Sequence, residues 1–339
     1  MDSVCGKFRR PAFGMIAVAV VGFITLTSIS AVAADKVRVG VLSYGTGQWE
    51  MDVIKTNKLA EAEGLDLEIV GLGRKLTHAI ALENKSVEIV MTDYLWVSEQ
   101  RAAGADFTFV PHSKVAGGII ARPDRGINTL ADLKGKTLGI VGGPSEDNWL
   151  VLRAYTKKAL GFDIAEEATV KFVGAPPLLN AAVEKGDLDA VMNFWHYNAR
   201  LRAKGYKDLV AIEDMLSTLG VKHVPPILGW VFSEAWANEN PQIATGFLRA
   251  SLAAKKKLKG DGFGRTSSNA EWDRLAGKMK AEGDAGLHTA LRDAYRAGIP
   301  DGYGDREITA AEEVFAMLSR ETGEARTIAP GTFWAGFRF

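Results

Sequence analysis

The segment VEIVMTDYLWVSEQRAAG at residues 87–104 returns later in the chain as LDAVMNFWHYNARLRAKG at residues 188–205. The two segments align without a gap, and Val90, Met91 and Arg101 are identical in both. In each, an apolar run typical of a strand leads into a helical pattern, and a short amphipathic helical pattern precedes the run. Chance similarity between two apolar strands is one explanation. We favour the other, a pair of similar α/β units.

The first strand of each unit gives a second correspondence. VGVLSYGTGQW at residues 39–49 is matched at a similar offset by LGIVGGPSEDNW at residues 138–149. Strand-like and helix-like segments alternate along the chain, which favours an α/β fold with mostly parallel sheets. Open sheets of this class bind ligands at the carboxyl ends of their strands. The sequence therefore predicts two lobes, each with one ligand-facing loop after its first strand and another after its third.

Gly45 and Gly47 follow the first strand, as glycines do in a dinucleotide-binding site. The third glycine of that pattern is missing, because Glu50 occupies its position. We therefore interpret the glycines as freeing a loop that closes over a small solute, and we expect no cofactor.

Residues 1–34 have the three parts of a secretory signal peptide. Basic residues near the N-terminus are followed by an uninterrupted apolar run and by small residues that suit cleavage after Ala33 or Ala34. A membrane anchor is the alternative, but the apolar run is barely long enough to span a bilayer. The only cysteine, Cys5, precedes that run and leaves with the signal peptide. We therefore expect a periplasmic protein without disulfides or thiolate metal sites.

The charge balance argues against nucleic acid as a partner. The chain has 41 Lys+Arg and 41 Asp+Glu, and the predicted signal peptide removes three basic residues and one acidic residue. The exported chain is then slightly acidic and lacks the basic excess that binds phosphate backbones. Its length of about 305 residues is enough for two domains, and we expect it to act as a monomer.

No pattern of catalytic residues is recognisable. The five histidines are scattered, without the spacing of metal ligands, and the sequence has no H-E-x-x-H or G-x-S-x-G motif. Among the histidines, we place only His196 in the predicted cleft. The sequence therefore predicts a binding protein with no catalytic residue and no metal site. An exported enzyme, or a periplasmic sensor subunit on the same fold, is the alternative from another class.

Polar and aromatic side chains gather where the predicted strands end. Because aromatic residues at strand ends do not fit the cores of those strands, we expect them to clamp a flat ligand, with Trp49 and Trp195 stacking on it. Asp93, Asn148 and Asn193 would fix its orientation. The ligand-binding residues predicted on this basis are Tyr44, Thr46, Gln48, Trp49, Asp93, Tyr94, Ser145, Asp147, Asn148, Trp149, Asn193 and Trp195.

INTLADLKGKTLGIVGG at residues 127–143, SEAWANENPQIATGFLRASLAA at residues 233–254 and the two repeated strand segments carry a family resemblance. They resemble the periplasmic substrate-binding proteins of ABC importers in the nitrate/sulfonate/taurine (NitT/TauT, SsuA/ThiY-like) family, over nearly the whole exported chain. The resemblance implies a type II periplasmic binding fold, which has two α/β lobes, two crossovers and a ligand cleft between the lobes. It also implies two partners, an ABC permease and its cytosolic ATPase.

The same resemblance implies how the chain is divided. Lobe 1 would comprise residues 35–116 plus 229–339 and lobe 2 residues 117–228, with a hinge near Val115–Arg122 and Val224–Val231. The ligand-contacting loops of the family fall on several of the strand ends named above. They add Arg74 and Thr77 to the predicted ligand-binding residues.

The charge of the ligand is less sharply indicated than the fold. Sulfonate and nitrate binders of the family present hydroxyl and free N–H groups at helix N-termini, where the helix dipole favours anions. Here Glu146 and Asp147 begin the corresponding helix, which opposes an anion, although first-turn acids also stabilise helices in general. Arg74 and Lys75 are basic and would favour an anionic ligand. We predict an aromatic or nitrogen-containing heterocycle, with an organic sulfonate or related anion as the alternative.

Overall fold

The computed structural model describes residues 1–2, 6, 34–73, 76–144, 146–260, 267–323 and 326–339. The predicted signal peptide lies almost entirely outside the described residues, and so do Arg74, Lys75 and Ser145. All helices and strands of the described part of the chain lie between Asp35 and Thr322. Within these ranges, no helix combines the length and the apolar character needed to cross a membrane.

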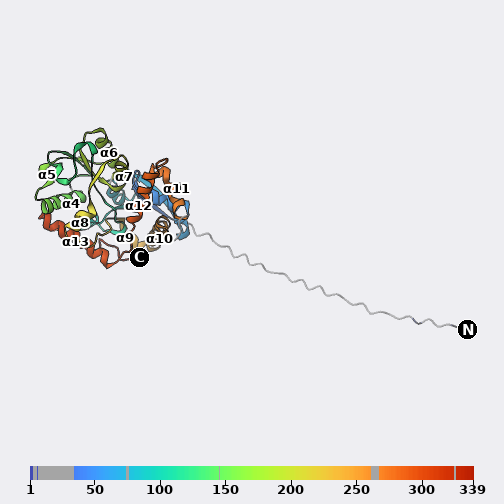
Figure 1. The fold of residues 1–339 in the computed structure, drawn as a ribbon. Helices are drawn as coiled ribbons and strands as arrows, with labels where there is room; N and C mark the ends of the chain where they lie inside the picture. The colour runs from blue at the N-terminus through green and yellow to red at the C-terminus, as the bar shows by residue number, and fades with distance from the viewer. Residues whose placement is uncertain (3–5, 7–33, 74–75, 145, 261–266, 324–325) are drawn as a thin grey trace. The chain divides into compact units, whose positions relative to one another are not determined.

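Two separate five-stranded sheets organise the chain (Figure 1). Sheet A has the strand order β2-β1-β3-β10-β4. Its strands are β1 (Asp35–Leu42), β2 (Leu65–Leu72), β3 (Ile89–Asp93), β4 (Phe107–Ser113) and β10 (Leu228–Ser233). β1 is parallel to β2 and β3, whereas β10 lies antiparallel between β3 and β4. Val39 and Ile89 pair in the centre of this sheet and are fully buried, as parallel strands covered on both faces require.

Sheet B has the corresponding strand order β7-β6-β8-β5-β9. Its strands are β5 (Gly117–Ala121), β6 (Thr137–Val141), β7 (Thr169–Val173), β8 (Ala190–Phe194) and β9 (Lys207–Ala211). β6 is parallel to β7 and β8, and β5 is antiparallel to β8 and β9. Sequence analysis did not predict β9, an edge strand whose residues are partly or fully exposed and so lack an apolar run.

The chain crosses from sheet A to sheet B between β4 and β5 and returns between β9 and β10. We call sheet A with its helices lobe 1 and sheet B with its helices lobe 2. Two mixed α/β lobes joined by two crossovers confirm the predicted fold class. The exact division of the chain into domains stays a prediction.

Helices cover both sheets (Figure 1). The helices that follow the strands of sheet A, or come after its last strand, are α1 (Gly47–Thr56), α2 (Leu76–Glu83), α3 (Tyr94–Ala102), α9 (Glu234–Glu239), α10 (Pro241–Lys259), α11 (Ser267–Met279), α12 (Ala285–Ala297) and α13 (Asp305–Thr322). Those that follow the strands of sheet B are α4 (Asp147–Tyr155), α5 (Ile164–Glu167), α6 (Pro176–Lys185), α7 (Trp195–Ala203) and α8 (Ile212–Thr218).

Helix ends match the sequence signals unevenly. Gly161 takes the left-handed conformation after the α4 segment, and Pro176 opens α6, in keeping with the preferences of glycine and proline at helix ends. The helical pattern of the sequence continues toward Gly64, but α1 ends at Thr56. The reason is local, because Lys58 adopts a positive φ of 52°, which no helix accommodates.

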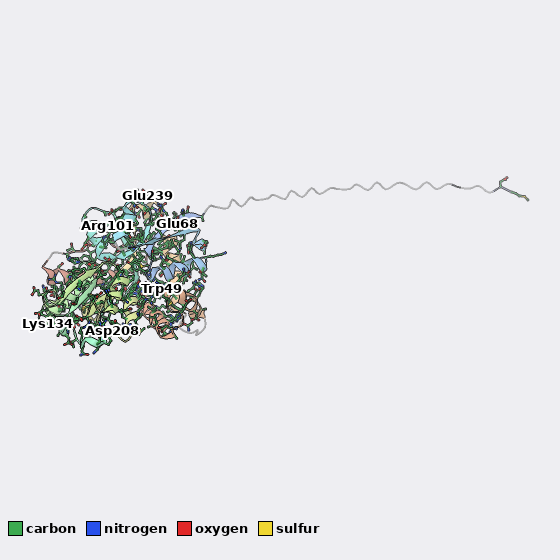
Figure 2. The ribbon with its side chains drawn as sticks, turned by 90° about the horizontal axis from the view of Figure 1, so that it is seen from above. Trp49, Glu68, Arg101, Lys134, Asp208 and Glu239 are labelled. Carbon is green, nitrogen blue, oxygen red and sulfur yellow. The ribbon has the colours of Figure 1, made fainter. Side chains whose placement is uncertain are left out.

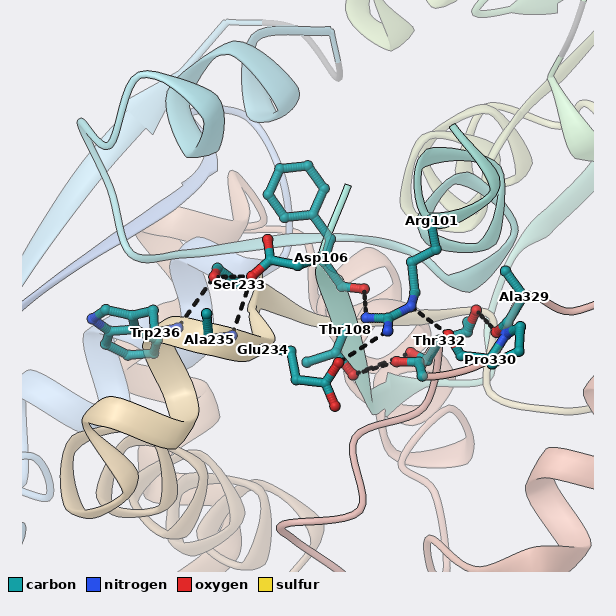
Figure 3. A network of polar contacts seen from close by, with 12 residues as sticks. Arg101, Asp106, Thr108, Ser233, Glu234, Ala235, Trp236, Ala329, Pro330 and Thr332 are labelled. Atoms are coloured by element: carbon teal, nitrogen blue, oxygen red, sulfur yellow. Dashed lines mark hydrogen bonds and ion pairs between the residues drawn. The ribbon is translucent and has the colours of Figure 1, made fainter. Parts of the chain in front are cut away.

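The C-terminal segment after α13 is tied to lobe 1 by a polar network (Figure 3). The Arg101 guanidinium on α3 donates to the carbonyl oxygens of Pro330 and Phe107 and pairs with Glu234 at 2.9 Å. Residue Phe109 of β4 exchanges backbone hydrogen bonds with this segment, donating to the Thr332 oxygen and accepting from the Trp334 N–H group. The segment therefore covers the outer edge of sheet A, where an unpaired strand would otherwise be exposed.

Helix α13 itself contacts lobe 2. It lies beside α4 and α8 in Figure 1, and its Phe315 and Leu318 belong to the apolar cluster that includes Leu152 of α4 and Met215 of α8. Phe315 also packs against Tyr94 of lobe 1, with ring centroids 6.1 Å apart. The C-terminal region thus contacts both lobes, in addition to the two crossovers.

Candidate functional site

A cavity of about 100 Å³ lies where the strand ends of the two lobes meet. Lobe 1 contributes the loop after β1 and the end of β3, and lobe 2 contributes the starts of α4 and α7. Both crossovers also take part, through Val115 and Ala116 on the way out and Ile227 and Leu228 on the return. The cavity is therefore where the fold class predicts a ligand, outside the carboxyl ends of the strands.

Five of the predicted ligand-binding residues line this cavity. They are Thr46, Asp93, Asp147, Asn148 and Trp195. Each stands at a strand end or in the first turn of the helix that follows, which is the position the repeat in the sequence indicated. The structure thus brings together residues that lie up to about 150 positions apart, since the two sheets face each other through these edges.

Three aromatic residues of the predicted clamp do not line the cavity. Trp49, Tyr94 and Trp149 are only 3%, 0% and 4% exposed, and none of them lines the cavity. Trp49 packs edge-on against Trp272 at 6.3 Å, Tyr94 against Phe109 at 5.8 Å, and Trp149 against Phe172 at 5.8 Å. The expectation failed because one face of a helix that follows a strand turns back to the core, so an aromatic residue in its first turn packs there.

The Asn193 side chain is buried and makes hydrogen bonds within lobe 2. Its Nδ2 group donates to Asn180 Oδ1 at 2.8 Å and to the Pro176 oxygen at 3.1 Å, while its Oδ1 accepts from the Phe194 N–H group. The side chain therefore joins the start of α6 to the end of β8 and has little left to offer a ligand.

Three of the remaining predicted residues are described and do not line the cavity. Tyr44, Gln48 and Thr77 are partly exposed and lie beside residues that line it. Arg74 and Ser145 lie outside the described residues. For these five positions, a role in ligand binding stays a prediction.

His78 and Phe194 are among the lining residues that the sequence analysis did not predict. His78 comes from α2 and Phe194 from the end of β8, and both face the cavity together with His196. His78 is one position beyond the loop that the family resemblance assigned to the ligand, so a slightly longer window would have included it. Phe194 appeared to be a plain strand residue, because its apolar side chain continues the pattern of β8.

Burial governs the ionisation of the groups around the cavity. It lowers the pKa of His196 to about 3, and the charge of Arg200 acts in the same direction, so the imidazole is neutral at physiological pH. Burial also raises the pKa of Tyr94 well above its usual range, and the carboxylates of Asp147 and Asp93 add to that shift.

Asp93 has a second, local role. Its Oδ1 accepts a hydrogen bond from the Trp96 N–H group at 2.7 Å and so caps α3. The equivalent position of the repeat, Phe194 before α7, has no side-chain cap. In the part of the chain that the structure describes, no group of three or more His, Cys, Asp or Glu residues is placed to hold a metal ion.

Trp195 joins the lobes beside the cavity. It starts α7 in lobe 2, and its ring meets the edge of Trp49 of lobe 1 with centroids 6.1 Å apart. The labelled Trp49 lies within the molecule in Figure 2, whereas Glu239 and Lys134 are exposed at its surface. The indole of Trp195 therefore shares one side with the core of lobe 1 and another with the cavity.

A buried network of charged and polar side chains surrounds Glu50, the residue after Trp49. Glu50 is fully buried and pairs with Lys255 at 3.1 Å, and it accepts hydrogen bonds from Ser251 at 2.5 Å and from Tyr295 at 2.8 Å. Burial by itself would raise the pKa of Glu50, but Lys255 and the hydrogen bonds outweigh it, so the pKa is lowered. Burial lowers the pKa of nearby His112 to about 3. The network holds α1, α10 and α12 of lobe 1 together.

Comparison with known proteins agrees with this geometry. The sequence model of the family described as NMT1/THI5 like matches residues 61–260, which is more than half of the chain. The chain belongs to the NMT1/THI5-like family. The matched range of this NMT1/THI5-like chain includes both repeated segments and most of the cavity wall. No protein with a curated description matches its sequence.

Solved structures share the NMT1/THI5-like chain's fold at low sequence identity. The alkanesulfonate-binding protein SsuA from Xanthomonas axonopodis pv. citri bound to MOPS is 18% identical, with a TM-score of 0.69 over 90% of this chain and 99% of that one. The periplasmic aliphatic sulphonate binding protein SsuA from Escherichia coli is 19% identical, with a TM-score of 0.67 over 88% and 92% of the two chains. The desulfurization enzyme DSZB is 12% identical, with a TM-score of 0.56 over 87% and 94%. These likenesses support the fold alone.

Proposed function

We propose that the chain is the periplasmic solute-binding component of an ABC importer. It would capture one small solute in the cavity between the lobes and deliver it, as a monomer, to a permease driven by a cytosolic ATPase. The observation that carries the proposal is the cavity itself, which is lined from both lobes at their strand ends. A site built in this way is complete only when both lobes contribute, so that binding and lobe closure are coupled.

The crossovers give closure a structural basis. Val115 and Ala116 belong to the first crossover, Ile227 and Leu228 adjoin the second, and all four line the cavity. A hinge movement at these segments would therefore change the cavity directly. The contact between Trp195 and Trp49 would form and break with the same movement, because the two indoles belong to different lobes.

We further propose a flat, largely apolar ligand, an aromatic or nitrogen-containing heterocycle. Its support is the wall of the cavity, in which Leu42, Met91, Phe194 and Trp195 surround a few polar groups. Such a wall stabilises a ring by contact area, while a few polar side chains fix its orientation. An organic sulfonate or related anion, held by Arg74, is the alternative, and the similar fold of two sulfonate-binding proteins supports it.

Thermal unfolding with a solute library tests the proposal. The chain from residue 35 onward is unfolded alone and with sulfonates, pyrimidines, pterins, amines and other small solutes. A ligand that binds only the folded chain raises the midpoint by mass action, by an amount equivalent to about 2.7 kcal/mol at a hundredfold excess over Kd. We expect a rise with one chemical class. Chemical turnover of a stabilising compound would instead identify an enzyme, and the absence of any rise would contradict the proposal.

A further inference from the structure

We propose that Arg200 of α7 locks the two lobes around a bound solute by closing onto the C-terminal end of α11 in lobe 1. The inference rests on the proposed function and adds to it the contact that keeps the solute enclosed. Arg200 is not one of the residues that line the cavity. It acts through the position of α7, so we describe it as a positioning residue.

Helix α7 belongs to lobe 2, lines the cavity and also touches lobe 1. Trp195 and His196, in its first turn, line the cavity. Trp195 and Ala199, one turn apart, belong to the apolar cluster of lobe 1 that contains Leu291 and Tyr295 of α12, and α7 lies beside α12 in Figure 1. One face of α7 is therefore seated on lobe 1. Whatever holds that face in place also holds this part of the cavity wall.

Arg200 supplies a polar contact at the same junction. Its Nη2 group donates a hydrogen bond to the Met279 carbonyl oxygen at 2.7 Å. Met279 is the last residue of α11, and Lys280, with a positive φ of 51°, follows it. The carbonyl groups of a last helical turn lack partners within the helix and form the negative end of its dipole, so they attract a guanidinium group. The contact thus joins a cation of lobe 2 to a helix end of lobe 1.

The guanidinium is held in place from its own helix as well. Arg200 lies over the ring of Tyr197, with the guanidinium carbon 5.9 Å from the ring centroid. The face of an aromatic ring attracts positive charge. Tyr197 therefore directs the cation while α7 carries it toward α11.

The Arg200 contact also has a cost. Burial lowers the pKa of Arg200, because its charge is less well solvated here than in water. Its Nη1 group is buried and has no hydrogen-bond partner in the described part of the chain, and a buried donor without a partner is unfavourable. Both costs disappear when the lobes separate and the guanidinium returns to water. The lock is therefore weak enough to open, and it holds the lobes together when a bound solute adds contacts of its own.

Arg202 provides a matched comparison on the same helix. It is exposed, and its guanidinium donates to Asp208 at 2.8 Å. Asp208 belongs to β9, so this ion pair stays within lobe 2. Replacing Arg202 removes the same charge from α7 without removing a contact between the lobes.

A distance measurement across the lobes tests the lock directly. The chain from residue 35 onward has no cysteine, because Cys5 precedes it, so two labelling sites can be introduced cleanly. Ile80→Cys on α2 of lobe 1 and Leu178→Cys on α6 of lobe 2 replace side chains that are 50% and 64% exposed. Nitroxide labels at these sites give the distribution of distances between the lobes by pulsed electron paramagnetic resonance. The distribution is recorded without solute and with cytosine, a nitrogen heterocycle, or MOPS, a sulfonate, at millimolar concentration.

Three variants are compared with the parent chain in this measurement. Arg200→Met should reduce the ratio of short to long distances by about tenfold, as the loss of a hydrogen bond from a charged group implies. Arg200→Lys keeps a cation that reaches the same carbonyl and should reduce the ratio less. Arg202→Met should leave the ratio unchanged. If Arg200→Met does not fold, Arg200→Lys carries the comparison.

Solute exchange gives a readout that a merely structural role would not move. A lock that forms after the solute has entered slows dissociation and leaves association unchanged. Stopped-flow tryptophan fluorescence follows both rates, with Trp195 beside the cavity as a reporter. We expect whichever of cytosine and MOPS raises the unfolding midpoint to leave Arg200→Met about tenfold faster and to enter at the same rate. A variant that only damaged the fold would lower the unfolding midpoint and change both rates.

Two results would overturn the inference while solute binding itself stands. One is an identical distance distribution in the parent and Arg200→Met chains, both without solute and with the probes. The other is an equal shift in Arg202→Met, which would mean that any loss of positive charge from α7 opens the lobes. If no probe and no member of the wider library raises the unfolding midpoint, the proposed function fails, and the distributions of the solute-free chains alone decide whether Arg200 holds the lobes together.

Discussion

The junctions that end the two repeated segments occupy equivalent places in the lobes and differ in chemistry. In lobe 1, β3 leads into α3 through Asp93, whose carboxylate caps the helix and lines the cavity, while Tyr94 turns into the core. In lobe 2, β8 leads into α7 through Phe194, and the aromatic residues themselves line the cavity. The same junction of the repeat thus presents a carboxylate to the cavity in lobe 1 and aromatic rings in lobe 2.

The difference teaches how a duplicated fold builds one asymmetric site. The backbone of each lobe places a strand end and a helix start at the cavity, and the residue chosen at the junction decides what is presented there. In lobe 1 the Asp93 carboxylate caps the helix and the next residue, Tyr94, packs inward. In lobe 2 no side chain caps the helix, and Phe194 and Trp195 line the cavity. Four predictions test this comparison, in order of expected effect.

Trp49→Ala should have the largest effect, and on stability. Because Trp49 is buried among the rings of lobe 1, its removal leaves a large cavity in the core, and we expect the free energy of unfolding to fall by about 5 kcal/mol. Urea unfolding followed by circular dichroism measures this. Trp236→Ala, at a partly exposed position on α9, is the matched control and should cost much less. A stable Trp49→Ala chain with lost solute affinity would restore the aromatic clamp.

Lys255→Met should lower the free energy of unfolding by about 4 kcal/mol, because it leaves the buried Glu50 carboxylate without its cation. The same urea titration measures the loss. Adding Glu50→Gln to this variant removes the orphaned charge and should recover part of the stability. If adding Glu50→Gln lowered the free energy of unfolding of Lys255→Met further, the lost ion pair would not be the source of the effect.

Stability should fall as the pH is lowered from 6.5 to 5, and His196→Gln should reduce that fall. The pKa of His196 is lowered from 6.5 to about 3 in the folded chain, so within this window the unfolded chain binds a proton that the folded chain does not. The free energy of unfolding then decreases by about 2 kcal/mol over the window for each such histidine. His112, with its pKa also lowered to about 3, contributes in the same direction and remains in the variant. An unchanged pH slope in His196→Gln would contradict the assignment.

Trp195→Ala should have the smallest effect of the four, and the effect should be on the affinity for the solute. We expect it to weaken the affinity for the best solute by about 1 to 2 kcal/mol, roughly tenfold in Kd, through lost contact with the ring. Calorimetric titration below the unfolding range measures it, and Trp195→Phe, which keeps an aromatic face, should lose less. An equal loss in both variants would mean that the indole serves the contact with Trp49 more than the ligand.

The sequence alone predicted the fold class, because apolar runs and helical patterns repeat with a spacing that favours two similar α/β lobes. It also located the cavity at strand ends, since parallel strands of one sheet end at one edge. Asp93, Asp147 and Trp195, predicted in this way, line the cavity. Local signals such as Pro176 and Gly161 were sufficient for helix ends that depend on one residue's backbone preference.

Tertiary structure alone decided which side chains in the first turn of each helix face the cavity. Trp49 and Trp195 are both first-turn tryptophans, yet the first is enclosed by Trp272 and Tyr295, while the second borders the cavity. Their surroundings come from α11 and α12, far along the chain, and no local pattern encodes that packing. The same holds for the presence of Asp93 and Asp147 in one cavity wall, because the distance between residues on different lobes is set by how the two sheets meet.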